Sequence, residues 1–292
     1  MEPSAPWQHG VLDPQGPVGA AERTILANAT VIMLAVIIPV ILLTLTFAWW
    51  FRASNPHAKR RLDWAYSGSI EVTVWSIPML VILFLGGIAW VGAHDLDPHE
   101  PLMGGAKPLE VQVVSLDWKW LFIYPDQGLA SLDELVVPVG VPLRLRLTSA
   151  TVMNSFFVPQ LGSQIYTMAG MTTTLNLRAD RAGTFPGLSA QFSGDGFSDM
   201  RFDTRAVAPA QFDAWVARTR GSARGTLDQQ QYGQLASAAR TASPITYSAV
   251  EPRLFETILQ LSAPAKAFAS GTTTAPGSSA PSSPPMPTQV MN

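Results

Sequence analysis

Two long apolar runs occupy the first third of the chain. The first, TILANATVIMLAVIIPVILLTLTFAWWF, covers residues 24–51, the second, VTVWSIPMLVILFLGGIAWVGA, covers residues 72–93, and neither contains a charged residue. Each exceeds the roughly 20 residues that a helix needs to cross a bilayer core. Two buried core helices are the alternative, which these lengths disfavour. The pattern predicts a two-helix transmembrane hairpin over residues 23–95, with spans at about 24–51 and 70–93.

The charges around these runs indicate an orientation. Loops on the cytoplasmic side of a membrane carry an excess of Lys and Arg. Only Arg23 precedes the first run, whereas the loop between the runs contains Arg52, Lys59, Arg60 and Arg61. We therefore expect this loop in the cytoplasm and both termini outside. Residues 1–22, the external N-terminal segment, lack the apolar core of a signal peptide, so either a signal was removed or the first span serves for export.

From residue 107 the pattern changes to short apolar segments bounded by Gly, Pro, Asn or Asp. The segment LRLRLT, residues 143–148, alternates with a period of two, which predicts a strand with one buried face. The number and spacing of these segments predict an antiparallel β-sandwich over residues 107–208. The segments are 109–124, 134–140, 142–149, 155–162, 172–179, 183–192 and 200–208.

Helical patterns follow the sandwich and form an aromatic-rich extension over residues 209–262. They cover residues 209–220, 226–240 and 251–262. The last segment, residues 263–292, is rich in Ser, Thr, Ala and Pro, and its composition cannot supply a core, so it is predicted to be a disordered tail. The fold class is thus a membrane-anchored α+β chain with a transmembrane hairpin, an external all-β sandwich and C-terminal helices.

Composition narrows the possible functions. Charged residues make up only 14% of the chain, against about 25% in soluble domains. The net charge of −2 provides no basic footprint, which excludes nucleic acid as a partner. The chain contains no cysteine, so it can form no disulfide, no thiolate metal site and no cysteine-linked lipid.

The segment GLSAQFSGDGFSDM, residues 187–200, has the length of a metal-binding loop but few metal ligands. Taken alone, it could be an ordinary Gly/Ser surface loop. A hairpin followed by an external sandwich, however, resembles subunit II of the haem-copper respiratory oxidases. In members that oxidise cytochrome c, this cupredoxin-like domain holds a binuclear copper centre. Its ligands are a His in a His-Ser pair and a later Cys-x-Glu-x-Cys-x-x-x-His-x-x-Met pattern.

That pattern aligns with this chain without a gap. The first His position falls on Asn154, the Cys positions on Ser189 and Ser193, the Glu position on Gln191 and the second His position on Phe197, while Met200 is retained. Copper in such centres requires soft thiolates and imidazoles, which hydroxyl and phenyl groups cannot replace. The six positions are therefore interpreted as a vestigial copper site. This loss is typical of the quinol-oxidising branch, and residues 12 to about 262 resemble subunit 2 of the bo-type ubiquinol oxidases.

The resemblance implies a function and a set of partners. The chain would be a non-catalytic subunit of a proton-pumping complex in the bacterial inner membrane that oxidises ubiquinol and reduces oxygen to water. It would hold no cofactor or metal itself, and haems, copper and ubiquinol would lie in subunit I. Direct contact is expected with subunit I, and the complex would also contain subunits III and IV. Lipid would surround the hairpin, and cytochrome c would not be a partner.

Glu71 is the one candidate for proton chemistry. It opens the sequence Glu-x-x-x-Trp-x-x-Pro at the start of the second apolar run. In the resembling family this glutamate marks the entrance of a proton-uptake pathway into subunit I. An ionisable residue at such a place is a functional candidate on physical grounds as well. The alternative is a plain carboxylate that reaches the membrane interface.

Other residues allow a rival reading. A cluster of Met153, Met168, Met171 and Met200 in a cupredoxin-like domain could bind Cu(I), which would make the chain a membrane-anchored periplasmic copper carrier. A cytochrome c oxidase subunit is excluded because electron entry there requires the missing thiolates. Trp118 and Trp120, in the sequence DWKW, are interpreted as core and contact residues. The histidines, at positions 9, 57, 94 and 99, lack metal-ligand spacing.

Overall fold

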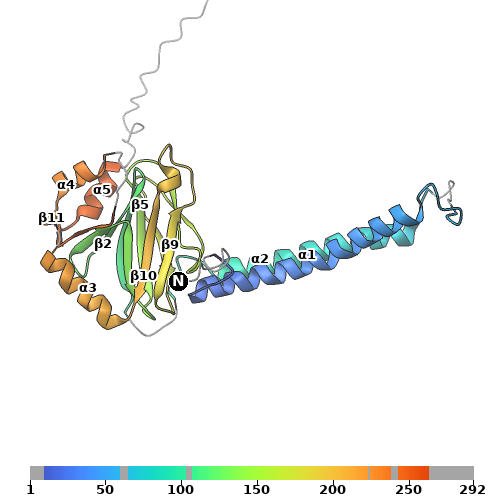
Figure 1. Ribbon diagram of the computed structural model, residues 1–292, viewed down its shortest axis with the longest axis horizontal. Helices are drawn as coiled ribbons and strands as arrows, with labels where there is room; N and C mark the ends of the chain where they lie inside the picture. Colours follow the sequence, from blue (N-terminus) through green and yellow to red (C-terminus); the bar gives the residue numbers. More distant parts are fainter. Residues whose placement is uncertain (1–9, 60–64, 103–106, 223, 238–242, 263–292) are drawn as a thin grey trace, which may run out of the picture.

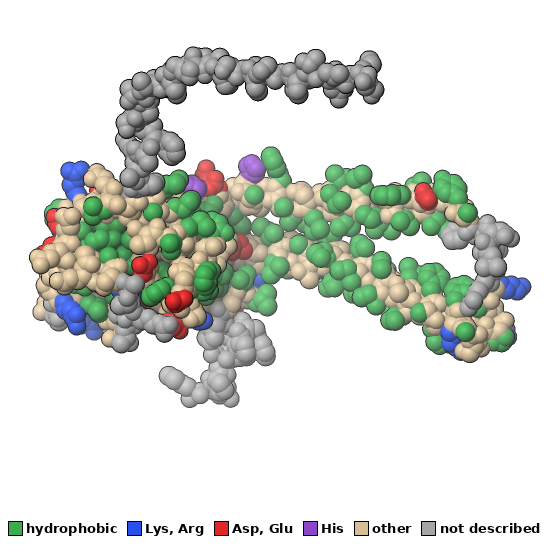
Figure 2. Space-filling view, turned by 90° about the horizontal axis from the view of Figure 1, so that it is seen from above, with side chains coloured by type: hydrophobic (Ala, Val, Ile, Leu, Met, Phe, Trp, Pro, Cys, Tyr) green, Lys and Arg blue, Asp and Glu red, His purple; other side chains and the backbone are tan. Residues whose placement is uncertain are grey.

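A computed structural model describes residues 10–59, 65–102, 107–222, 224–237 and 243–262. Two long helices, α1 (Pro17–Trp50) and α2 (Gly68–Asp95), run side by side and project from a β domain (Figure 1). Both are long and apolar enough to cross a membrane, and their apolar windows are 0% buried within the chain. Figure 2 shows hydrophobic side chains along both helices. The predicted hairpin is confirmed as a pair of helices of membrane-spanning length.

The threonine hydroxyl groups of the two helices are satisfied by the helices themselves. In α1, four threonines donate hydrogen bonds of 2.6–3.0 Å to the carbonyl group four residues earlier. Thr73 does the same in α2, at 3.0 Å. Because lipid offers no hydrogen-bond partners, this local pairing removes the cost of placing these hydroxyls in a bilayer.

Both ends of the hairpin are fixed to the β domain. Before and within the first turn of α1, the amides of Gln15 and Gly19 donate to the carbonyls of Gln160 (2.7 Å) and Leu161 (3.1 Å). After α2, the carbonyl of Pro98 accepts from the backbone amide (3.1 Å) and the side-chain amide (2.9 Å) of Asn176. The start of α1 and the end of α2 therefore lie on the same side of any membrane that the hairpin crosses.

Two mixed sheets form the β domain. The six-stranded sheet has the order β12-β3-β2-β1-β5-β8, and the five-stranded sheet has the order β4-β10-β9-β6-β7. The strands of the first sheet are β1 (Leu109–Leu116), β2 (Lys119–Tyr124), β3 (Leu129–Leu132), β5 (Leu143–Ser149), β8 (Thr173–Leu177) and β12 (Ile245–Tyr247). Those of the second are β4 (Glu134–Pro138), β6 (Asn154–Phe157), β7 (Ile165–Thr167), β9 (Gly183–Ser189) and β10 (Arg201–Val207).

The sandwich differs from the sequence prediction in two respects. The pairs β1/β5 and β4/β10 are parallel, so the prediction of a purely antiparallel sandwich is wrong. The apolar run 109–124 is a hairpin of β1 and β2 rather than one strand, because the chain turns at Asp117 and Trp118. Strand pairing over long sequence distances is decided by packing between segments, which the local apolar pattern does not contain.

The main core lies between the two sheets and is rich in aromatic rings. Phe156 and Phe202 stack with ring centroids 5.0 Å apart, and Trp120 meets Phe156 edge-on at 5.3 Å. Phe202 fits because its neighbour in β9 is a glycine: a Cβ atom on Gly187 would lie 2.1 Å from the Phe202 ring. The pairing of Gly187 with Phe202 therefore determines how closely the ring packs against β9, the strand that leads into the site described below.

The C-terminal extension covers the side of the sandwich that is away from the hairpin (Figure 1). Helix α3 (Pro209–Ser222) closes one end of the main core, with Trp215 against Tyr124 at 5.3 Å. Helices α4 (Gln229–Leu235) and α5 (Leu254–Ser262), with the short strands β11 (Thr226–Leu227) and β13 (Ala249–Val250), cover the outer face of the six-stranded sheet. Helix α4 is shorter than the predicted segment 226–240. The predicted disordered tail, residues 263–292, lies outside the described residues.

Candidate functional site

The loop between β9 and β10 is closed by the strands at its two ends. Since β9 and β10 pair antiparallel, with Leu188 opposite Arg201, the ends of the loop meet, and the amide of Ser189 donates to the carbonyl of Met200 at 3.1 Å. A 3₁₀ turn, Phe197–Asp199, precedes Met200. We call residues 189–200 the site loop. Its strand connection places Ser189 and Met200 side by side although they are distant in sequence.

Asn154 reaches this loop from β6, which pairs with β9 on the same sheet. The hydroxyl of Ser189 donates to the side-chain oxygen of Asn154 at 2.9 Å. The side-chain amide of Asn154 lies 3.5 Å from the hydroxyl of Ser115, which is 3.1 Å from that of Thr167. All four side chains are at most 3% exposed. They form a connected buried polar network that joins β1 of one sheet to β6, β7 and β9 of the other.

The other predicted vestigial positions are more loosely joined. Met200 is 1% exposed, packs in the main core, and its sulfur lies 4.0 Å from the hydroxyl of Ser193. Gln191 contributes its backbone carbonyl, which accepts from Ser189 at 3.3 Å, while its side chain is half-buried. Phe197 packs edge-on against Phe192 at 5.7 Å. The structure therefore brings Asn154, Ser189, Ser193 and Met200 together, and Phe197 belongs to an aromatic pair at the loop surface.

The donor set does not fit a copper centre. Its oxygen donors are neutral hydroxyl and amide groups, and those of Ser189 and Asn154 are hydrogen-bonded to each other. Only one thioether, that of Met200, offers a soft ligand, and copper sites of this kind need thiolates and imidazoles. Within the part of the chain that the structure describes, no three His, Asp or Glu residues gather as a metal site. The hydrogen-bonded network can hold β1, β6, β7 and β9 together without a metal.

The tryptophans of DWKW have different places. Trp120 is fully buried in the main core, as predicted. Trp118 is half-buried and contacts the site loop: its indole N–H donates to the carbonyl of Ser193 at 3.2 Å. Its ring lies so close to Gly196 that a Cβ atom there would be 2.2 Å from it. Trp118 is a contact residue, as predicted, but its partner could not be named from the sequence. The signal that could have found it is the pair of glycines, Gly194 and Gly196, in the site loop.

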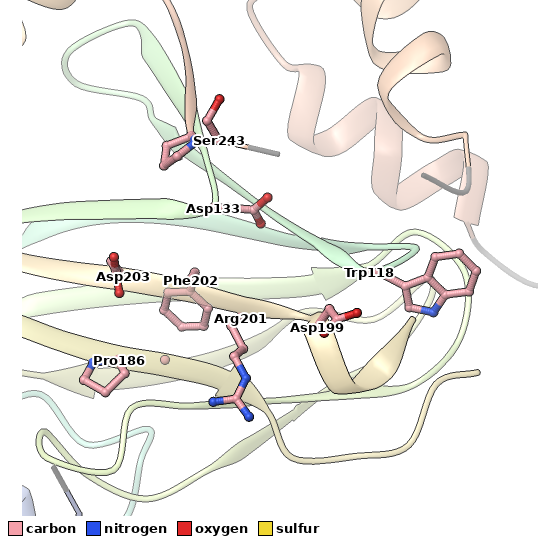
Figure 3. A pocket seen from close by; sticks show the side chains of 10 residues that line it. Trp118, Asp133, Pro186, Asp199, Arg201, Phe202, Asp203 and Ser243 are labelled. Atoms are coloured by element: carbon pink, nitrogen blue, oxygen red, sulfur yellow. The ribbon is translucent and has the colours of Figure 1, made fainter. Parts of the chain in front are cut away.

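A groove of about 650 Å³ runs beside the site loop. Figure 3 shows Trp118 and Asp199 near one end, Arg201 and Pro186 on β10 and β9, and Ser243 on the opposite rim. Asp133 stands between the two rims and accepts a 2.7 Å hydrogen bond from the amide of Trp120. The mixture of acidic and basic side chains in this groove indicates no particular ligand.

Glu71 and the described histidines lie away from the site loop. Glu71 is exposed in the first turn of α2, at the end of the hairpin that is distant from the β domain. His57, His94 and His99 are exposed; His99 lies 3.0 Å from Asp97. Hydrogen bonds from the backbone amide and ring of His99 lower the pKa of the Asp97 carboxyl. Position 9 lies outside the described residues.

Comparison with known proteins decides the family. The family model "Cytochrome C oxidase subunit II, periplasmic domain" matches residues 126–207, which include all six of the predicted vestigial positions. The chain is 52% identical to ubiquinol oxidase subunit 2 of Acetobacter aceti over 85% of this chain and 81% of that protein. It is 48% identical to cytochrome bo(3) ubiquinol oxidase subunit 2 of Pseudomonas aeruginosa, over 85% of this chain and 75% of that protein.

The chain belongs to the ubiquinol oxidase subunit 2 family.

A more distant member supports the same assignment. Cytochrome bo(3) ubiquinol oxidase subunit 2 of Buchnera aphidicola is 40% identical over 85% of this chain and 87% of that protein. The predicted fold class is confirmed: a hairpin of two apolar helices precedes a cupredoxin-like sandwich with C-terminal helices. In this member of the ubiquinol oxidase subunit 2 family, a buried hydrogen-bonded network occupies the end of the sandwich where Asn154 and Ser189 meet.

Proposed function

We propose that the chain is the non-catalytic subunit II of a proton-pumping ubiquinol oxidase that oxidises ubiquinol and reduces oxygen to water. One observation carries the proposal: Ser189 and Asn154, which stand at copper-ligand positions of the related cytochrome c oxidases, hydrogen-bond to each other at 2.9 Å. A domain that accepts electrons from cytochrome c needs soft ligands at these positions. A quinol oxidase delivers electrons elsewhere, so its subunit II can keep the scaffold without the metal.

The proposal places all redox groups in a partner. Haems, copper and the ubiquinol site would belong to subunit I, and the complex would contain subunits III and IV. The hairpin supports such assembly because its apolar side chains are exposed along both helices, among them Leu42, Trp75 and Phe84 at 59–74%. Two helices cannot bury this surface between themselves. Lipid and the helices of subunit I would cover it through close van der Waals packing.

The proposed orientation puts both termini and the β domain on the periplasmic side of the bacterial inner membrane. Two facts support it. Both ends of the hairpin are hydrogen-bonded to the β domain, so they share one side. The opposite end carries the described basic residues Arg52 and Lys59, in agreement with the excess of positive charge in cytoplasmic loops.

Glu71 would serve as the proton-uptake residue of this subunit. Its place in the first turn of α2 puts a carboxylate at the cytoplasmic end of the hairpin in the proposed orientation. A carboxylate there can exchange protons with water and still face a neighbouring helix.

The rival function, a Cu(I) carrier, needs several thioethers at one point. Met153 and Met171 are 42% and 54% exposed, whereas Met200 is 1% exposed in the core.

Purification of the native complex tests the function. The complex should contain haem and copper, oxidise ubiquinol with consumption of oxygen, and fail to oxidise reduced cytochrome c. All copper should remain with subunit I after this chain is separated from it. Isolation of the chain without haem-containing partners, but with bound copper, would instead support the carrier.

A further inference from the structure

The β1–β2 turn contacts three separate segments of the chain through three consecutive residues. We propose that this turn, Asp117–Lys119, couples the C-terminal extension to the site loop, so that the order of the site loop depends on the docking of helix α4. The inference concerns contacts within this chain and does not depend on the proposed function. It rests on one backbone conformation and on the hydrogen bonds that surround it.

Trp118 is held in an unusual backbone conformation. Its φ is 64°, in the left-handed region that large side chains rarely adopt. Such strain persists only where the surrounding structure maintains it. Here the indole N–H donates to Ser193 O at 3.2 Å, and the ring covers the backbone at Gly196, which is buried. Gly194, at φ 102°, lies beneath the same ring. Trp118 therefore fixes the middle of the site loop.

Lys119, the first residue of β2, points to the face of the sheet opposite Trp120, as successive residues of a strand do. It is 4% exposed, and its ammonium group donates to the carbonyls of Leu235 (2.7 Å) and Ser237 (2.9 Å). Carbonyl groups at a helix C-terminus carry partial negative charge, which favours a cation. Burial lowers the pKa of Lys119, and the carboxylates of Asp133 and Asp117 act in the opposite direction. A buried ammonium needs these partners, so Lys119 fixes the end of α4.

Asp117 completes the set of contacts. Its carboxylate accepts a 2.7 Å hydrogen bond from the hydroxyl of Thr151, in the segment that leads from β5 into Asn154. The turn has only two residues between paired strands, since Leu116 is opposite Lys119. A shift of Lys119 would therefore rotate the peptide bond that it shares with Trp118. Loss of the α4 contact should be transmitted to the indole ring and from there to the site loop.

Hydrogen exchange of the full-length chain in its purified complex tests this coupling. Lys119→Met keeps the length of the side chain and removes the donor. Exchange protection should fall at least about fivefold in α4, and also in the site loop, where the amides of Ser189, Phe197 and Met200 are hydrogen-bonded. Lys107→Met is the matched control, because Lys107 is exposed and pairs with Asp126 at 2.8 Å. If protection falls in α4 alone, the coupling does not exist.

A second variant tests the reverse direction. Trp118→Phe keeps a ring over Gly196 but removes the donor to Ser193. Since coupling between two sites is reciprocal, protection should fall in the site loop and also in α4. An effect confined to the site loop would contradict the proposal. Trp118→Phe alone decides the question if Lys119→Met does not assemble into the complex.

Discussion

The hydroxyl group of Ser189 donates a 2.9 Å hydrogen bond to the side-chain oxygen of Asn154, in the interior between β6 and β9. The sequence prediction assigns these two residues to the positions of a thiolate and an imidazole in the copper-containing oxidases that the chain resembles. Under that assignment, a direct hydrogen bond between the side chains stands where a metal would join the two strands. Ser115 and Thr167 extend the contact to the second sheet and to the edge strand β7.

Removal of the Ser189 hydroxyl should destabilise the β domain. Ser189→Ala leaves the buried oxygen of Asn154 without its donor, which costs about 1–3 kcal/mol of unfolding free energy. Ser193→Ala is the matched control in the same loop, since that hydroxyl makes a long 4.0 Å contact with the Met200 sulfur. Denaturant unfolding of residues 107–262 measures both. Equal effects of the two substitutions would contradict the role of the buried network.

Gly187→Ala should be far more damaging than an ordinary glycine substitution. The new methyl group would lie 2.1 Å from the Phe202 ring, which is packed against Phe156 and cannot move away freely. We expect a loss of about 1–3 kcal/mol or more, as for other overpacked cores. Gly233→Ala, in α4 with open space around it, should be neutral or slightly stabilising. Thermal unfolding of both variants checks the difference.

Burial of Tyr232 predicts a specific loss of stability at high pH. Burial raises its pKa from 10.0 to about 12. The unfolded chain begins to release the phenol proton near pH 10, while the folded chain retains it. The contribution of the neutral, buried phenol to the unfolding free energy is therefore complete below pH 10. It is lost progressively between pH 10 and 12, by about 2 kcal/mol. Tyr232→Phe should flatten the dependence of unfolding free energy on pH in this range. Tyr166→Phe, at an exposed ring, is the control.

Glu71→Ala should slow turnover of the assembled oxidase. If the carboxylate takes up protons, alanine cannot replace it, and oxygen reduction should fall by about tenfold or more, while Glu71→Asp keeps part of the rate. Glu100→Ala, at an exposed carboxylate after α2, should leave the rate unchanged. Oxygen consumption by purified complexes with equal haem content measures the effect. A normal rate in the assembled Glu71→Ala complex would reduce Glu71 to an interfacial carboxylate.

Copper binding should be recoverable by restoring the ligands. The substitutions are Asn154→His, Ser189→Cys, Ser193→Cys and Phe197→His, with Gln191→Glu as a refinement. Ser→Cys is nearly isosteric, and Met200 is already in place. Phe197→His breaks the contact with Phe192 and costs about 1–3 kcal/mol if the new ring is unpaired, which bound metal would offset.

The readout is the visible and EPR spectrum of the refolded domain after addition of copper. A mixed-valence binuclear signal is expected in the restored variant, and the unmodified domain should fold without metal and bind no copper stoichiometrically. Mononuclear copper alone in a well-folded variant would show that the assignment of ligand positions from Asn154 to Met200 is wrong.

The sequence by itself determined the two long helices, because uninterrupted apolar runs of that length have few stable alternatives to a membrane span. It also predicted which residues occupy the vestigial copper positions, since loop spacing is a property of the chain, and that assignment stays a prediction. The period-two pattern of residues 143–148 predicted β5 correctly. These features are local, so they can be predicted without knowing which other segments each one packs against.

Only the tertiary structure decided the parallel pairing of β1 with β5, the contact of Lys119 with α4, and the recruitment of Ser115 and Thr167 into the network around Asn154. These contacts join residues that are distant in sequence, and each depends on the packing of two sheets and an extension. The left-handed conformation of Trp118 is of the same kind. No local pattern favours it, and it is maintained because the indole ring is held against the site loop at Ser193 and Gly196.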